Sequence, residues 1–329
     1  MTAHSGDVND VDFDAMEVEF SNIADVVVER SVAAGELCTY RVGGPIQLLA
    51  RIESVEALAH VSEVLADARS SCLPIGKGSN LLVADDGFDG VAVVLGKAFD
   101  QVSIDGTTLV AGAGAFLPVV ARASVSAGLA GFEWAVGVPG SIGGAVRMNA
   151  GGHGSDMATN LRSIDVADLS LGGIVTRGVE SLDLGYRRSN LAPWQIVVSA
   201  TLDLAQATSP AKGQQTLRDI VSWRREHQPG GPNAGSVFTN PPNDSAGRLI
   251  DEAGLKGYRI GTAEVSEKHA NFIQVDPGGS ANDVMRLMIE IVDRVDHDFN
   301  IRLHSETRLV GFAQDLVDHV QPALDDEGQ

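Results

Sequence analysis

Two glycine-rich segments carry the residues best suited to binding an anion. The first runs Gly76-Lys77-Gly78-Ser79-Asn80, and the second runs from Gly137 to Gly144 as GVPGSIGG. Glycines let successive backbone N–H groups converge because no Cβ stands in the way, and such a concavity suits a phosphate or diphosphate. The side chains of Ser79, Asn80 and Ser141 could add donors. For either loop alone, a pair of ordinary tight turns is an equally good interpretation.

Neither loop matches the standard nucleotide-binding motifs. A Walker loop requires Lys after its second glycine, whereas Ser79 follows Gly78. A dinucleotide-binding fingerprint requires a third glycine and a following helix, but Leu81 occupies that position and opens the apolar run LLVA, which is typical of a strand. The segment 112–114 likewise has Leu117 where the third glycine belongs. A dinucleotide, if bound, must be held by a different fold.

The first loop must be positioned by a unit that spans residues 20–85. The run TYRVGGPIQLLARI indicates a turn at Gly43-Gly44-Pro45 and then a strand, and the short apolar segments around the loop predict flanking strands. Ser54 can cap a helix. The apolar face of that helix comprises Leu58, Val61, Leu65 and Ala68.

The second loop lies in a unit that spans residues 86–207. The segments VAVVL, QVSID and TLVAGAGA predict short strands, followed by a helix near residues 116–126 and a strand at IDVADL. Every second residue from Ile196 to Leu204 is apolar, which indicates another strand. We end this unit near residue 207 because residues 205–213 read as a small-residue and polar linker.

Residues 208–314 predict a compact α+β domain. A helix over Leu217 to Arg224 is stopped by HQPGGPN, a short helix contains Leu249, and a longer one runs from about residue 282 to 295. Strands are expected at YRIGT, NFIQV and ETRLVGF. The acidic ends, residues 1–19 and 315–329, are predicted to be mobile tails.

Length and charge restrict the classes of protein that fit. The chain has 329 residues, of which 44% are apolar and 21% charged, so a small disulfide scaffold and wholesale disorder are both excluded. The net charge is −20, but residues 1–29 hold eight acids and residues 313–329 hold five, which leaves −7 for the body. No run of Lys and Arg exists, so we expect no nucleic-acid partner.

The sequence contains no clear targeting or metal-binding motif. No apolar stretch approaches the roughly 18 residues that span a bilayer, and the acidic N-terminal segment does not resemble a signal peptide. We therefore expect a cytoplasmic protein without membrane insertion. Cys38 and Cys72 have no partner Cys or His at metal-ligand spacing, so we expect no metal site.

Several segments in order resemble one family. TYRVGGP, IGKGSNLLVADDGFDGVAVVL and GVPGSIGGAVRMNAGG look like the flavin-binding half of the UDP-N-acetylenolpyruvoylglucosamine reductases of the peptidoglycan pathway. GYRRSN, QPGGPNAGSVFTNPP, AGRLIDEAGLKGYRIGTAEVSEKHANFI and ETRLVGF resemble the remaining landmarks of that family in the same order. Together they cover residues 38–312.

The resemblance implies a fold and a cofactor. The fold is α+β, with a two-subdomain FAD-binding domain of the vanillyl-alcohol-oxidase type and a C-terminal α+β substrate domain. The two glycine loops would wrap the FAD diphosphate. The first loop contains no His, so a covalent flavin link is not expected there. The residues implied at the cofactor are Tyr40, Arg41, Gly43, Gly76, Lys77, Gly78, Ser79, Asn80, Leu81, Gly137, Pro139, Gly140, Ser141, Gly143 and Gly144.

The resemblance also implies a reaction and its catalytic residues. Hydride from reduced FAD reaches the β-carbon of an enol ether, so negative charge develops on the α-carbon and its carboxylate and must be stabilised. Arg187 is implied at that carboxylate, Glu306 beside the intermediate, and Ser236 as proton donor to the α-carbon. Without the family, Ser236 would be a turn or cap residue and Glu306 would pair with Arg308 at the surface.

The implied substrate is a nucleotide sugar that carries a diphosphate. Residues 212–268 are nearly neutral, which permits an anionic ligand. The chain departs from the family at Gly152-His153, where an aromatic residue is common after NAG, and at Thr239, where a base is common. It also lacks the tyrosine-bearing insertion of one subclass, so another group must replace that tyrosine. The residues implied at the substrate are Arg224, Asn240, Lys268, Asn271 and Arg308, with Arg225 and Arg248 as further candidates.

We therefore expect an NADPH-dependent reductase with non-covalent FAD that converts UDP-N-acetylglucosamine enolpyruvate to UDP-N-acetylmuramate. The alternatives are a related FAD oxidase of small alcohols and a non-catalytic flavin or nucleotide-sugar binding module. The oligomeric state is open, with a monomer slightly favoured.

Overall fold

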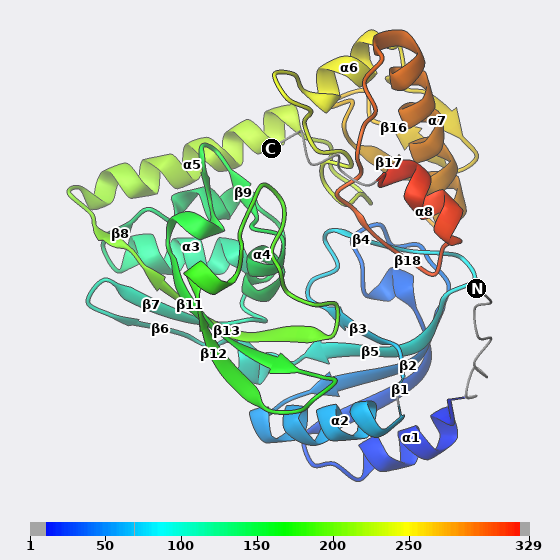
Figure 1. Cartoon of the computed structure of the whole chain (residues 1–329). Helices are drawn as coiled ribbons and strands as arrows, with labels where there is room; N and C mark the ends of the chain where they lie inside the picture. The colour runs from blue at the N-terminus through cyan, green and yellow to red at the C-terminus, as the bar shows by residue number, and fades with distance from the viewer. Residues whose placement is uncertain (1–10, 69, 323–329) are drawn as a thin grey trace.

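The computed structural model describes residues 11–68 and 70–322, which form three parts (Figure 1). The first part is a four-stranded sheet in the order β1-β2-β5-β3, with α1 and α2 packed on one face. β1 is antiparallel to β2, whereas β2, β5 and β3 run parallel. Its elements are α1 (Phe13–Ser21), β1 (Val26–Ala33), β2 (Pro45–Ile52), α2 (Val55–Ala68), β3 (Cys72–Ile75), β4 (Leu81–Val83) and β5 (Phe88–Leu95).

The α2 helix forms as its sequence predicts. Ser54 Oγ accepts a hydrogen bond from the backbone N–H of Ala57 at 3.2 Å, which caps the helix. Leu58, Val61 and Leu65 are buried against the sheet. The predicted helix and its apolar face are therefore confirmed.

The mobile tail predicted for residues 1–19 is wrong for residues 13–19, which belong to α1. Asp12 caps this helix through its side chain, and Met16 and Phe20, four residues apart, are buried in the same core as α2. Arg30 forms ion pairs with Asp14 and Glu17. The acids lie on the outer face of this amphipathic helix, so the charge count over residues 1–19 did not predict the helix. Residues 1–10 lie outside the described residues.

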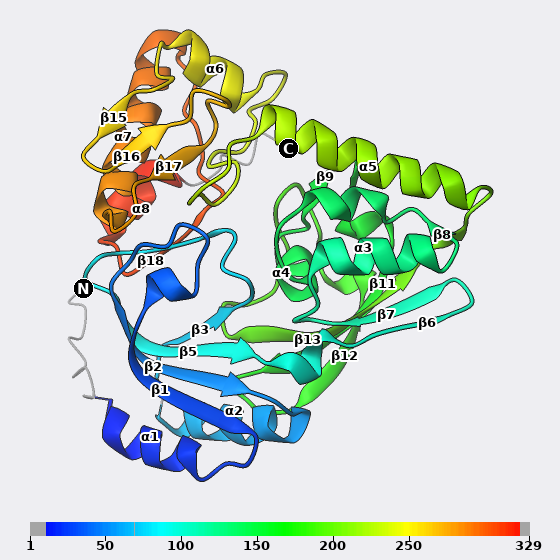
Figure 2. The same ribbon diagram turned by 180° about the vertical axis from the view of Figure 1, so that it is seen from behind.

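The second part is a five-stranded antiparallel sheet in the order β12-β11-β13-β7-β6 (Figure 2). The alternating strand predicted at residues 196–204 is β13, but its two faces enter different cores: Val197 and Ala200 pack in this part, and Ile196 and Val198 pack against the first. The elements are β6 (Val102–Asp105), β7 (Thr108–Gly112), α3 (Leu117–Ser126), β8 (Leu129–Ala130), α4 (Ile142–Arg147), β9 (Gly151–Gly152), β10 (Ser155–Asp156), β11 (Leu161–Asp168), β12 (Ile174–Gly178), β13 (Gln195–Asp203) and β14 (Ala205–Gln206).

The third part contains a small antiparallel sheet, β15-β16-β17, covered by α7, with α6 and α8 beside it. The helix α7 is amphipathic, and one face from Val284 to Val295 is completely buried. The elements are α5 (Pro210–His227), α6 (Ala246–Glu252), β15 (Arg259–Ile260), β16 (Ala263–Val265), β17 (Ile273–Val275), α7 (Ala281–Phe299), β18 (Arg308–Val310) and α8 (Gln314–Val320).

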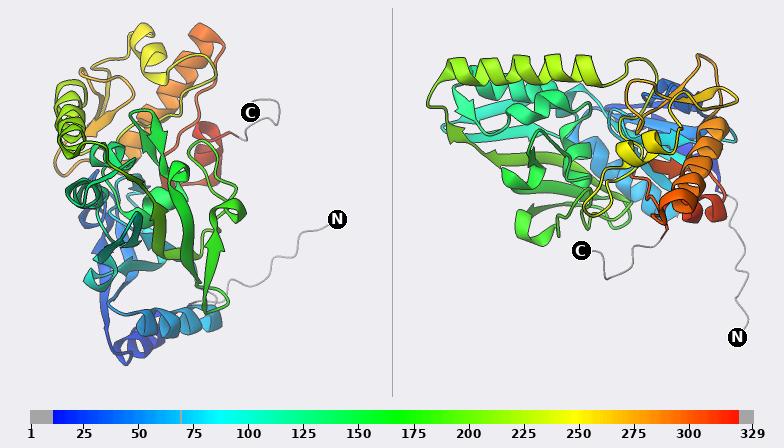
Figure 3. Two further views of the ribbon diagram at one scale, coloured as in Figure 1. Left: turned by 90° about the vertical axis from the view of Figure 1, so that its left-hand side faces the viewer. Right: turned by 90° about the horizontal axis from the view of Figure 1, so that it is seen from above.

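Three elements of this last segment differ from the predicted domain boundaries. Helix α5 packs on the second part, because Leu217 and Ile220 enter its core (Figure 3). Strand β18 pairs in parallel with β4 of the first part instead of joining the third-part sheet. Helix α8 occupies residues predicted as a tail, since Val320 is buried and accepts a hydrogen bond from Ser305. Residues 323–329 lie outside the described residues.

Within the described residues, no helix is long and apolar enough to cross a membrane.

Candidate active site

The two glycine loops meet face to face. The first connects β3 to β4, and the second precedes α4. A Cβ on Gly76 would lie 2.5 Å from Ser141 Oγ, and a Cβ on Gly140 would lie 3.1 Å from Ser79 Oγ. Glycine is needed at these positions because a side chain would separate the loops. The structure thus brings together two segments that are about 60 residues apart in sequence.

The backbone of the loops, more than their side chains, offers donors to an anion. Within the described part of the chain, the backbone N–H groups of residues 76–80 and 140–141 donate to no protein acceptor. Ser141 Oγ is occupied, since it caps α4 by accepting from the N–H of Gly144 at 3.4 Å. Asn80 Nδ2 donates to the carbonyl of Glu306 at 2.8 Å. The free backbone amides fit a diphosphate.

The segment with Tyr40 and Arg41 is joined to the first loop. Thr39 N donates to Gly78 O at 3.0 Å, and a Cβ on Gly78 would lie 1.9 Å from Leu37 O. The side chain of Tyr40 is completely buried, its hydroxyl has no hydrogen-bond partner, and burial raises its pKa. A buried hydroxyl without a partner, one residue after the segment that binds Gly78, fits a site that a polar cofactor completes. Arg41 is exposed, with a φ of 58°.

Arg187 and Glu306 form an ion pair between distant segments. Arg187 Nε lies 3.1 Å from Glu306 Oε2, and these side chains are only 26% and 13% exposed. Arg187 Nη2 also donates to the carbonyl of Gly151 at 3.1 Å. The Arg187 backbone is left-handed, with a φ of 57°, in a tight turn closed by the bridge between Gly185 and Arg188. Strain of this kind is concentrated at functional sites.

Glu306 is set up to hold a proton. Burial of its carboxyl group raises the pKa to about 7, and Arg187 only partly opposes that shift. Glu306 pairs with Arg187 instead of Arg308, so the surface ion pair that spacing alone suggests does not form.

Ser236 lies beside Glu306 through the backbone. Glu306 N donates to Val237 O at 2.9 Å, and Thr239 N donates to His304 O at 2.9 Å, so residues 237–239 and 304–306 run antiparallel. Ser236 is partly buried, and its hydroxyl makes no hydrogen bond to any described residue. The backbone of Ser236 thus lies beside the segment that carries Glu306, and Glu306 pairs with Arg187. The catalytic roles of the three residues stay a prediction.

Of the predicted substrate residues, Asn271 is committed to the protein interior. Asn271 is buried; its Oδ1 accepts from Phe238 N at 2.9 Å and its Nδ2 donates to Phe238 O at 2.8 Å. Each amide atom thus has one protein partner, and substrate contact by Asn271 stays a prediction. Asn271 fixes the strand that follows Ser236.

The other predicted substrate residues are more accessible. Arg224 Nε donates to Gln228 at 2.7 Å, and burial lowers the pKa of Arg224. Asn240 accepts from Ala246 N at 3.0 Å at the start of α6, and Lys268 Nζ donates to Arg225 O at 2.6 Å. Substrate contact by Arg224, Asn240 and Lys268 stays a prediction.

Arg308 lies on the cofactor-loop side. It begins β18, and its N–H donates to Asn80 O at 3.0 Å, at the end of the first glycine loop. The side chain is partly buried near Cys72 and Arg147, has no carboxylate partner among the described residues, and burial lowers its pKa.

Sequence reasoning missed Arg147, the base at the end of GSIGGAVR. It donates to the carbonyls of Leu191, Ala192 and Gln195, and burial and the nearby Arg308 lower its pKa to about 10. Neither guanidinium group has a carboxylate partner among the described residues, and two such groups close together suit an anionic ligand. Its place directly after the second glycine loop was the available signal.

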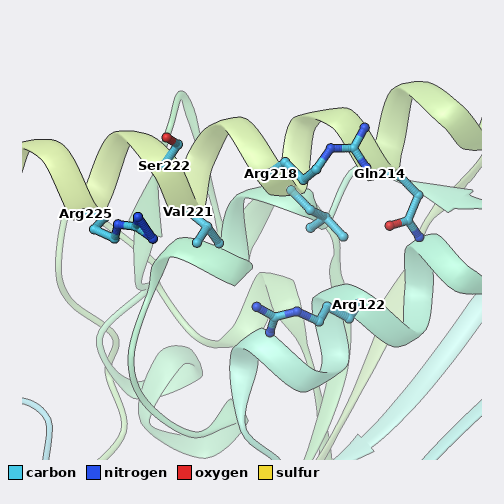
Figure 4. Close-up of a pocket in the computed structure, with 7 residues that line it drawn as sticks. Arg122, Gln214, Arg218, Val221, Ser222 and Arg225 are labelled. Carbon is cyan, nitrogen blue, oxygen red and sulfur yellow. The ribbon is translucent and has the colours of Figure 1, made fainter.

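Arg225 and Arg248 point elsewhere. Arg225 lines a surface groove of about 380 Å³ between α3 and α5, together with Arg122 and Arg218 (Figure 4). Arg248 forms exposed ion pairs with Asp244 and Glu252. In neither case does the structure bring the side chain to Arg187 and Glu306. Within the described residues, no cluster of His, Cys, Asp and Glu could hold a metal ion.

The fold and the paired loops define a flavin-binding class of protein. Residues 46–178 match an FAD binding domain, and residues 226–310 match the C-terminal domain of UDP-N-acetylenolpyruvoylglucosamine reductase. The fold is therefore a vanillyl-alcohol-oxidase-type FAD-binding domain followed by the C-terminal α+β domain.

The chain aligns with several curated relatives over most of their length. UDP-N-acetylenolpyruvoylglucosamine reductase of Rubrobacter xylanophilus is 40% identical, covering 83% of this chain and 91% of the relative; that of Heliobacterium modesticaldum is 42% identical, covering 85% and 90%. The crystal structure of the Thermus caldophilus reductase superposes with a TM-score of 0.76 at 35% identity, covering 87% of this chain and 99% of that one. The chain belongs to the UDP-N-acetylenolpyruvoylglucosamine reductase family.

Proposed function

We propose that this protein uses NADPH and FAD to reduce the enolpyruvyl ether of UDP-N-acetylglucosamine enolpyruvate, which gives UDP-N-acetylmuramate for peptidoglycan synthesis. The observation that carries the proposal is the Arg187–Glu306 ion pair, which lies beside Ser236 and is tied through Asn80 to the first glycine loop. A cation, a carboxyl with a raised pKa and a free hydroxyl are the three groups that this reduction needs.

The glycine loops would hold FAD by its diphosphate. Their free backbone N–H groups are donors, the Tyr40 hydroxyl lacks a partner, and Arg147 and Arg308 supply positive charge. FAD supplies hydride transfer when it is bound. We assign Arg308 to the cofactor and not to the nucleotide sugar, because it lies next to Asn80 and Arg147.

The catalytic residues handle charge and a proton. Arg187 binds the substrate carboxylate, where negative charge increases as hydride adds to the β-carbon. Glu306, in its protonated form, donates a hydrogen bond to the same developing charge. Ser236 gives its hydroxyl proton to the α-carbon, which is basic enough in the carbanionic intermediate to accept it. Asn271 keeps the Ser236 strand in place through Phe238.

The absorption spectrum of the purified protein tests the proposal. NADPH should bleach the flavin bands under anaerobic conditions, and the enolpyruvyl nucleotide sugar should restore them. Fast reoxidation by air without turnover of the enol ether would instead favour an oxidase. Binding of FAD and nucleotide sugar without either half-reaction would favour a binding module. Cytoplasmic location and a monomeric state stay predictions.

A further inference from the structure

The chain returns to the Glu306 segment after the matched C-terminal domain ends. Helix α8, red in Figure 1, leads it back, and Val320 O at the end of this helix accepts a hydrogen bond from Ser305 N at 2.8 Å. Pro322 O lies 3.1 Å from His304 Nδ1. The chain directly after α8 therefore lies along the segment that includes Glu306.

Gln321 bridges the two carbonyl groups on either side of Glu306. Its Nε2 donates to Ser305 O at 3.1 Å and to Thr307 O at 2.7 Å. Both acceptor residues are buried, so their carbonyls have little access to water. A side-chain amide carries two N–H donors on one nitrogen, which suits two neighbouring acceptors. Because a buried carbonyl without a partner is costly, this bridge stabilises the backbone around Glu306.

The opposite edge of the same segment contacts the first glycine loop and residues 237–239. Glu306 N donates to Val237 O at 2.9 Å, and Asn80 Nδ2 donates to Glu306 O at 2.8 Å. Along an extended segment, successive residues direct their backbone polar groups to opposite edges. The two neighbours of Glu306 therefore face Gln321, whereas Glu306 itself faces the glycine loop. The backbone around Glu306 is thus held on both edges.

Arg187 is the charged group that acts on the carboxyl of Glu306 among the described residues, with its Nε 3.1 Å from Oε2. On the Glu306 segment itself, the ring of His304 lies at a carbonyl of the chain after α8, and Arg308 lies near the Cys72 thiol. The side chains that hold this segment from the glycine loop and from the end of α8 are amides, which carry no charge.

We propose, on the basis of the proposed function, that Gln321 is a positioning residue for the reduction: its bridge holds the Glu306 carboxyl at Arg187 and away from water. Gln321 acts through the backbone, because its amide contacts the carbonyls of the two flanking residues. A residue that only fastened α8 would not need to bridge the two residues that flank a catalytic carboxyl. Gln321 also lies beyond the residues that match the C-terminal domain, so that domain does not itself supply the contact.

Gln321→Met in the full-length, FAD-loaded protein tests this proposal, since Met has a similar size but no N–H donor in its side chain. Flavin reoxidation by the enolpyruvyl nucleotide sugar should slow at least about tenfold more than flavin reduction by NADPH, because a small displacement of a catalytic group has effects of this size. The fall of the reoxidation rate near pH 7 should move to lower pH, since burial is the larger cause of the raised pKa of Glu306 and water would then reach the carboxyl. Gln314→Ala, which removes an exposed amide contact to Asp318 within α8, is the matched control and should change neither quantity.

An unchanged reoxidation rate and pH profile in Gln321→Met, even with a lower midpoint of thermal unfolding, would show that Gln321 only fastens α8 and would overturn the proposal. An equal slowing of both half-reactions, or the same defect in Gln314→Ala, would overturn it as well.

A titration of Glu306 decides the role of Gln321 without turnover. The infrared band of the Glu306 carboxyl, identified by its absence in Glu306→Gln, should titrate at lower pH in Gln321→Met than in the original protein. The same pKa in both proteins would contradict the proposal. If the original protein catalyses neither half-reaction, the proposed function fails, and this titration still shows whether Gln321 positions Glu306.

Discussion

The carboxylate of Asp85, between β4 and β5 of the first part, accepts a hydrogen bond from the backbone N–H of Ala281 at 2.8 Å. It also accepts from the N–H of Asn282 at 3.1 Å and from the Ser280 hydroxyl. A side chain from one part of the molecule therefore caps the N-terminus of α7, the main helix of another. An anion at this position satisfies free N–H groups and interacts favourably with the helix dipole. Asp85 thus helps to hold the C-terminal domain against the first part.

We expect Asp85→Ala to lower the free energy of unfolding by about 2 kcal/mol, since it removes a helix cap with charge-assisted hydrogen bonds. Urea unfolding followed by circular dichroism measures this. Asp86→Ala removes an adjacent, exposed acid and is the control. Equal stability of the two variants would show that the Asp85 contacts contribute little.

Ser236→Ala should separate the two half-reactions. Flavin reduction by NADPH should stay near normal, because this step needs no proton from Ser236. Reoxidation by the enolpyruvyl substrate should slow by about two orders of magnitude or more, since a positioned proton donor has been removed. Stopped-flow absorbance measures both rates. A similar slowing of both half-reactions would argue against the role of Ser236 as proton donor.

Glu306 should impose a pH dependence on the second half-reaction. Because burial raises the pKa of this carboxyl group to about 7, its protonated form is lost as pH rises through that value. The rate of flavin reoxidation by substrate should fall over the same range, and Glu306→Gln should lack this limb because its amide cannot titrate. A fall at the same pH in Glu306→Gln would assign the titration to another group.

The same shift has a consequence for stability. A carboxyl whose pKa is higher in the folded than in the unfolded protein stabilises the folded state below its unfolded pKa and loses that contribution as pH rises towards its folded pKa. Relative to Glu306→Gln, the original protein should therefore become less stable between about pH 4.5 and pH 7. Thermal unfolding of both proteins across this range gives the comparison.

The sequence predicted features that local patterns specify and missed those that depend on contacts between residues far apart in the chain. The cap and apolar face of α2 are local and were predicted, and ordered segments across residues 38–312 identified the family and its FAD-binding fold. The parallel pairing of β18 with β4 and the commitment of Asn271 to Phe238 are long-range contacts that no local pattern specifies. Helix α1 was missed because six acids within residues 1–19 outweighed its two buried apolar residues.

The packing of α1 can be tested at Phe20, which is completely buried. Phe20→Ala should lower the free energy of unfolding by about 3–5 kcal/mol, because it removes a large core side chain and leaves a cavity. Val18→Ala, at a position 61% exposed in the same helix, should have little effect. Turnover per folded molecule should be unchanged in both variants, since α1 packs in the core with α2 and contains none of the catalytic residues. If Phe20→Ala and the original protein have the same denaturant midpoint of unfolding, α1 does not stabilise the fold.

Arg308 offers a test of the cofactor assignment with a readout other than turnover. A cation near the flavin favours the reduced, more negative form, so Arg308→Met should shift the reduction equilibrium of the bound flavin at least about tenfold towards the oxidised form. For a two-electron couple this is a fall in midpoint potential of about 30 mV. Arg308→Lys should retain most of the original potential because the positive charge remains. Arg302→Met, which removes an exposed arginine paired with Asp296, is the control. A loss of FAD affinity at unchanged potential would place Arg308 at the diphosphate, and no change in either quantity would remove it from the cofactor site.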